Sequence, residues 1–254
     1  TFGGFTQFKF TYKKVDFYLG QSFNRTQYQR DGHYVSGLYP TNSYGKSDKK
    51  EFDSFGFKGG LTYKITGRHL FSVNAVYMTQ APTIRNVFPY ARLNNNATPN
   101  ITGETITSAD ASYIIRAPKL KTRITAFYSN IKHATQTAFF FGDGIFQDDG
   151  GDGGDAFVAE TIMDIEKRNM GVELGIEYQL TSTVKLTANG SYGEYIYNNN
   201  PTVFVNNDNL ASEDNTIPIT YFGEAKLKNY KLAGTPQAAA NFGVEYRDPH
   251  FWWI

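Results

Sequence analysis

Five aspartates in one glycine-rich stretch have the residue type and spacing best suited to binding a cation. They are Asp143, Asp148, Asp149, Asp152 and Asp155, within the sequence GDGIFQDDGGDGGDAF. Calcium takes several carboxylate and carbonyl oxygens from flexible turns of this kind. The residue register of a calcium-binding helix-loop-helix is missing, however, so we favour a solvated surface loop over a calcium site.

Catalytic groups are harder to find in this chain. The four histidines, His33, His69, His133 and His250, are scattered without metal-ligand spacing. Ser129 with His133 could be suggested as nucleophile and base, but four residues of an extended strand span about 13 Å, which is beyond hydrogen-bond reach. The chain has no cysteine, which excludes disulfides, thiolate metal sites and a cysteine nucleophile. We therefore expect no enzyme activity, no metal site and no cofactor.

The element that must position any functional side chain is a long amphipathic hairpin, and residues 51–80 give its pattern. In the first half Phe55, Phe57, Leu61 and Tyr63 share one parity, and polar or small residues occupy the other. A period of two is the signature of a β-strand. The second half alternates in the same way, and the connection at 66–68 is a short glycine-containing turn typical of an antiparallel hairpin.

The same pattern recurs along the chain. Further hairpins are predicted at 5–28, 107–128 and 172–192, a ninth strand at 240–246 and the start of a tenth at 251–254. Short turns fall near residues 14, 67, 117, 182 and 248, and long polar loops fall at 29–50, 81–103, 142–157 and 198–229. This alternation of short and long connections is typical of a transmembrane β-barrel, whereas a soluble sandwich has no reason to keep it.

Composition agrees with a barrel that has a wet interior. Aromatic residues make up 16% of the chain, yet the mean hydropathy is −0.45. Only every second strand residue of a barrel faces lipid, which reconciles the two values. The formal charge of +1 argues against a nucleic-acid partner. The aromatic residues close to the short turns suit an interfacial girdle; they are Tyr12, Phe17, Tyr63, Phe71, Tyr113, Tyr178, Tyr246, Trp252 and Trp253.

Four segments resemble the barrel of TonB-dependent outer-membrane receptors. They are Ala81-Pro82-Thr83-Ile84-Arg85-Asn86 after an amphipathic strand, Phe127-Tyr128-Ser129-Asn130-Ile131-Lys132 at a strand end, Gly171-Val172-Glu173-Leu174 at a strand start, and Gly234-Thr235-Pro236-Gln237 before a late strand. Their order covers most of the chain from about Phe52 onward. The long loops rich in asparagine and tyrosine resemble those of receptors from the Bacteroidetes group.

The resemblance implies a bacterial outer-membrane protein with a 22-stranded barrel and an N-terminal plug. It would take up a scarce ligand such as a siderophore, glycan or peptide, with energy from a TonB-type protein. Residues 1–254 would then be a partial barrel of about ten meandering strands, without the plug, the TonB-binding segment or the remaining strands. The chain starts at Thr1 without an export signal and stops four residues into a strand, so we expect an open, curved sheet rather than a closed barrel.

Two groups of residues are candidates for function in such a barrel. Lys58, Arg123, Glu173, Glu177 and Lys185 have the parity of the lumen, where we expect them to bond a plug and water rather than a passing ligand. Arg85, Asn86 and Arg92 lie in a loop that would face outside and are the first choice for ligand contact. Membrane lipid is an expected partner, as is a surface lipoprotein. The alternative is a self-contained outer-membrane barrel that acts as an adhesin, a passive porin or an enzyme.

Overall fold

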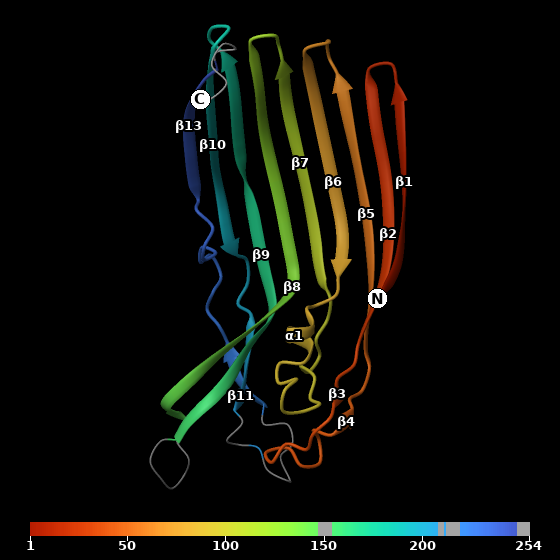
Figure 1. Cartoon of the computed structure of the whole chain (residues 1–254), viewed down its shortest axis with the longest axis vertical. Helices are drawn as coiled ribbons and strands as arrows, with labels where there is room; N and C mark the ends of the chain where they lie inside the picture. The colour runs from red at the N-terminus through yellow and green to blue at the C-terminus, as the bar shows by residue number, and fades with distance from the viewer. Residues whose placement is uncertain (147–153, 208–210, 212–218, 248–254) are drawn as a thin grey trace.

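The protein forms a tall, curved antiparallel sheet in a computed structural model that describes residues 1–146, 154–207, 211 and 219–247 (Figure 1). The strands follow one another across the sheet in chain order, from β1 at one edge to β13 at the other. They are β1 (Phe2–Tyr12), β2 (Val15–Tyr28), β5 (Lys50–Lys64), β6 (His69–Gln80), β7 (Glu104–Arg116), β8 (Leu120–Phe146), β9 (Gly154–Gln179), β10 (Val184–Tyr197) and β13 (Ala238–Tyr246). Two further strands, β11 (Thr202–Asn207) and β12 (Ile219–Glu224), bring this sheet to 11 strands within the described residues.

The register carries side chains of one character across neighbouring strands. Cross-strand partners on one face form an apolar row; in order from β1 to β13 they are Phe10, Phe17, Leu61, Val73, Ala111, Ala126, Val172, Tyr192 and Ala238. The partners one residue along form a polar row, which contains Asp16, Thr62, Ser72, Ser112, Thr125, Glu173 and Ser191. We call the two sides the apolar face and the polar face.

The apolar face is built to meet lipid. Large hydrophobic side chains are solvent-exposed there, among them Leu61, Ile124 and Leu174. Tyrosines border this band near the short turns, at Tyr63, Tyr113 and Tyr178, and again toward the long loops, at Tyr77, Tyr128 and Tyr192. An apolar band between two aromatic girdles is the pattern of strands that cross a bilayer. No helix within the described ranges is long and apolar enough to span a membrane.

All the short connections described lie at one end of the sheet, which we call the turn end, and the long ones at the other, the loop end (Figure 1). The predicted hairpin at 51–80 is confirmed, with its turn at 65–68. The sheet is open in the described residues, since β1 pairs with β2 alone and β13 with β10 alone. The prediction of an all-β, antiparallel, partial barrel wall is therefore confirmed. The predicted tenth strand and its turn partner at 248 lie outside the described residues.

Three predicted loops contain structure that the sequence reading missed. The loop predicted at 198–229 contains β11 and β12. The segment 81–103 contains a one-turn helix, α1 (Ile84–Val87), whose N-cap is Thr83. The loop at 29–50 holds the two-residue strands β3 (Asp31–Gly32) and β4 (Gly45–Lys46). In each case tertiary contacts, described below, stabilise a segment that has no amphipathic period of its own.

Strands β8 and β9 also run far beyond the predicted strand end near Tyr128. We call the part of this hairpin beyond Lys132 and Lys167, together with β11 and β12, the extension; it projects past the other strands at the loop end (Figure 1). Its base is a double irregularity. The register shifts around residues 131–136, and His133 and Asp164 face each other there, both in left-handed conformation with φ of 58° and 59°. The side chains of this pair are linked, with His133 Nδ1 2.7 Å from Asp164 Oδ1.

The facing of the wall is tested by two adjacent residues of β9. Leu174 lies on the apolar face and Glu173 on the polar face. Arginine at the lipid midplane costs about 2 to 4 kcal/mol, whereas polar-face changes are tolerated. We therefore expect Leu174→Arg in the full-length protein to abolish heat-resistant mobility on gels and Glu173→Ala to preserve it. An equal loss in both variants would contradict the assignment of the two faces.

Candidate functional site

The polar face carries a hydrogen-bonded chain of side chains that runs across four strands. Tyr18 Oη of β2 donates to Asn74 Oδ1 of β6 over a distance of 3.2 Å, and Asn74 Nδ2 donates to Asp110 of β7 at 3.0 Å. Gly60 of β5 lies between them in the register. A Cβ atom at Gly60 would overlap both the Tyr18 ring and the Asn74 amide, so glycine is required for this approach.

A second cluster surrounds Arg123 of β8. Its guanidinium donates to Ser112 Oγ at 3.1 Å and to Thr125 Oγ1 at 3.2 Å, and these two buried hydroxyls bond each other at 3.0 Å. The cluster forms part of a shallow hollow on the polar face, whose polar lining also includes Ser108, Asp110, Glu173, Asn189, Ser191 and Asn241. Such a lining offers donors and acceptors to water or a polar solute. It contains no pairing of nucleophile and base.

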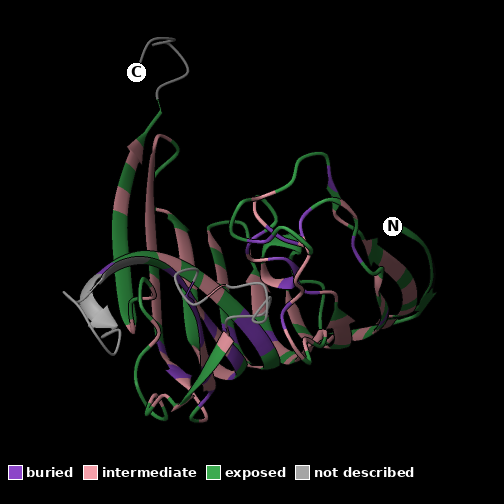
Figure 2. Cartoon of the chain, turned by 90° about the horizontal axis from the view of Figure 1, so that it is seen from below, coloured by how far each residue is buried: buried purple, intermediate pink, exposed green. Residues whose placement is uncertain are grey.

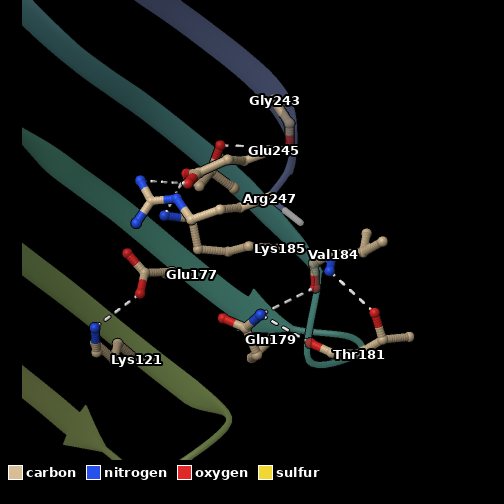
Figure 3. A network of polar contacts seen from close by, with 10 residues as sticks. Lys121, Glu177, Gln179, Thr181, Val184, Lys185, Gly243, Glu245 and Arg247 are labelled. Carbon is tan, nitrogen blue, oxygen red and sulfur yellow. Dashed lines mark hydrogen bonds and ion pairs between the residues drawn. The ribbon is translucent and has the colours of Figure 1, made fainter. Parts of the chain in front are cut away.

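Near the turn end, the polar face is cross-linked by ion pairs (Figure 3). Lys121 Nζ lies 2.8 Å from Glu177 Oε1, and Lys185 Nζ lies 2.5 Å from Glu245 Oε2. Arg247 joins the second pair at 3.2 Å. These contacts bridge adjacent strands, β8 to β9 and β10 to β13, so they hold the wall itself.

The five residues predicted to face the lumen all lie on the polar face, but in two different states. Arg123, Glu177 and Lys185 are engaged by neighbouring strands. Lys58 and Glu173 are exposed, and neither has an ion-pair partner within the part of the chain that the structure describes. The Lys58 side chain lies along Gly20, where an added Cβ would approach its Cε to 2.9 Å.

At the loop end, two loops are clasped together over the hollow of the sheet (Figure 2). We call them the first loop (29–49) and the second loop (81–103). Arg30 is their link: its guanidinium donates to the carbonyl oxygens of Ser43 at 2.7 Å and Ala91 at 2.6 Å, and to Asn95 Oδ1 at 2.5 Å. Burial lowers the pKa of the Arg30 guanidinium below its usual value, which fits a cation enclosed by the chain.

The clasp is further joined by backbone and amide contacts. Asn95 N–H donates to Asn42 O at 2.9 Å, and Asn42 Nδ2 donates to Asn96 Oδ1 at 2.5 Å. The side chains of Tyr39 and Val87 are fully buried here. The two loops therefore form a packed layer, although their sequences read as long polar connections.

The second loop is also docked against the extension. Asn86 Nδ2 donates to Thr135 O at 2.5 Å, and the Arg85 guanidinium lies 4.9 Å from the centre of the Phe139 ring. Tyr28 Oη on the polar face of β2 donates to Pro82 O at 3.1 Å, which places this loop on the polar side of the wall. Of the three predicted ligand contacts, Asn86 thus serves as an anchor, Arg85 is exposed on one side of a cation–π contact, and Arg92 is exposed.

Metal-binding chemistry has little support in this arrangement. His69 Nδ1 lies 2.8 Å from Tyr113 Oη, and His133 pairs with Asp164. Within the described ranges, no three side chains of His, Cys, Asp or Glu are grouped so that they could hold a metal ion. His250 and the central part of the aspartate-rich segment 142–157, with Asp148, Asp149 and Asp152, lie outside the described residues.

Comparison with known proteins gives two matches. A family model described as "TonB dependent receptor-like, beta-barrel" matches residues 1–253. Among solved structures, the "Copper transporter OprC" aligns with a TM-score of 0.59 and 16% sequence identity, over 80% of this chain. The chain spans 31% of the length of that structure. At this identity the likeness concerns the fold alone. No curated protein matches the chain.

The clasp gives a direct test of loop order. We expect Arg30→Ala to lower the free energy of local opening of both loops by about 2 to 4 kcal/mol, because three buried acceptors lose a charged donor. Amide hydrogen exchange of peptides from 29–49 and 81–103 in the full-length receptor measures this. Arg92→Ala, at an exposed position on the same layer, is the matched control. Equal protection in the two variants would contradict the role of Arg30.

Proposed function

Because the chain belongs to the family of TonB-dependent receptor-like β-barrels, a family of the bacterial outer membrane, we propose that it is part of the wall of a receptor for energy-coupled uptake. The observation that carries the proposal is the two-faced wall, whose apolar face is bordered by aromatic girdles and whose polar face is lined with bonded side chains. A transport path needs such a wet lining beside a lipid-facing exterior. We propose no catalytic step.

We propose that the remaining strands and a plug domain belong to the same receptor and complete the pore. Lys58 and Glu173, which are exposed on the polar face, would then bond the plug or lumen water. The partners that TonB-dependent receptors need for energy transduction would act through the plug side. The ion pairs of Glu177 and Lys185 keep the wall rigid against that movement, because each pair bridges two strands.

Ligand contact is proposed for the loop end, with Arg92 and Arg85 as the groups that reach solvent. Asn86 would act indirectly, since its amide holds the second loop on the extension. The ligand class remains a siderophore, a glycan or a peptide in this proposal. Copper is not carried over from the structural relative, because the described residues group no set of metal ligands.

We also propose that a surface lipoprotein docks on the first loop. Four hydrophobic side chains are exposed there, at Tyr34, Val35, Leu38 and Tyr44, and the Tyr34 side chain is 86% exposed. They lie at the loop end, away from the apolar band of the wall. Exposed apolar patches outside a membrane commonly mark protein contacts.

The orientation in the membrane follows from loop length, since short turns are periplasmic in barrels of this class. An epitope inserted at Gly37 in the first loop should be labelled on intact cells, and one inserted at Gly67 should be labelled after permeabilisation alone. Both glycines have open space around them, so neither insertion should disturb packing. Surface labelling at Gly67 together with protection at Gly37 would invert the proposed orientation.

Transport and ligand contact can be tested with labelled candidate ligands from the three classes. We expect uptake, but not surface binding, to be lost when the TonB-type protein is removed. In the double variant Arg85→Ala and Arg92→Ala, the KM for uptake should rise about tenfold or more, the effect of losing charged hydrogen bonds, at an unchanged surface level. Uptake that persists without the TonB-type protein would reject energy coupling, and an unchanged KM would reject the arginine contacts.

A further inference from the structure

A small enclosed cavity lies where the second loop meets the extension. It has a volume of about 20 Å³, and its lining includes Tyr90, Asn94, Thr98, Thr161, Phe204 and Asn206. A single water molecule needs about 10 to 15 Å³ of such space. The cavity is therefore large enough for one water molecule and too small for an organic ligand.

Asn94 of the second loop contributes a hydrogen-bond donor whose direction is fixed. The side chain is fully buried, and its Oδ1 accepts the N–H of Asn96 at 3.0 Å. This bond assigns the other end of the amide, Nδ2, as the donor. Nδ2 is buried and makes no hydrogen bond within the described residues.

Asn206 of β11 contributes an acceptor to the same joint. The residue is 7% exposed, and its Oδ1 is buried and without a hydrogen-bond partner within the described ranges. Its backbone oxygen already accepts from Tyr90 Oη at 3.2 Å, so the two elements touch beside the cavity. Two buried, unpaired polar atoms that line one cavity are costly unless a common partner satisfies both.

The chemistry of the two atoms selects the occupant. Asn94 Nδ2 requires a group that accepts a hydrogen bond, and Asn206 Oδ1 requires a group that donates one. An ammonium or metal cation cannot accept, and an inorganic anion cannot donate to Asn206. A neutral molecule that does both, and that fits in about 20 Å³, is water.

We propose that this cavity is the binding site of one structural water molecule, which accepts from Asn94 Nδ2 and donates to Asn206 Oδ1. The water would bridge the second loop to β11 and so fix the loop that carries Arg85 and Arg92 against the extension. The proposal is independent of the ligand and of energy coupling. It depends on the joint alone.

The first test is a high-resolution structure of the full-length receptor. We expect a solvent peak within hydrogen-bond distance of both amides. A dry cavity, or a direct bond between Asn94 and Asn206, would overturn the proposal.

The second test uses a double-mutant cycle in the same receptor, with hydrogen exchange of residues 89–99 as the readout. Asn94→Ala and Asn206→Ala should each lower protection about tenfold, and the double variant should lose no more than either single one, because both remove the same bridge. Arg92→Ala is the surface control. Losses that simply add would overturn the shared water, even where the variants are less stable overall.

Discussion

The structure depends on one constraint, which is that every backbone N–H and C=O group inside a membrane must bond another strand. The chain satisfies it between successive strands without a register shift in the membrane-facing part, from β1 through β2, β5, β6, β7, β8, β9, β10 and β13. A slip of one residue would exchange the apolar and polar faces of a strand. The bonded ladder and the sorting of side chains are therefore the same requirement seen twice.

Where the ladder leaves the membrane-facing part, the chain relaxes this rule. The paired left-handed residues His133 and Asp164 break the register of β8 and β9 at the base of the extension. Asn199 holds the break, since its Nδ2 donates to Asp164 O at 2.6 Å and its Oδ1 accepts from Glu166 N at 2.9 Å. A wall made for lipid thus changes into a separate sheet that can support the second loop.

Much of the wall could be predicted from local pattern, and little of the loop end could. The parity of Leu174 against Glu173 is visible in the sequence because a strand imposes it locally. The extension was missed because the bulge at His133 interrupts the alternation that identifies a strand. Arg30 was not singled out, since its three acceptors come from residues far along the chain. Asn86 was read as a ligand contact for the same reason: its partner Thr135 is 49 residues away.

The chain-order pairing of the wall has a consequence for how such proteins can change in size. Each hairpin from the turn end is a self-contained pair of strands, whose neighbours on either side also present the start or the end of a hairpin. Duplicating or deleting one such unit in the gene would leave every other register intact. Because adjacent strands lie about 4.8 Å apart, each step would alter the circumference by about 10 Å. Pore bore in this architecture can therefore evolve in discrete increments of one hairpin.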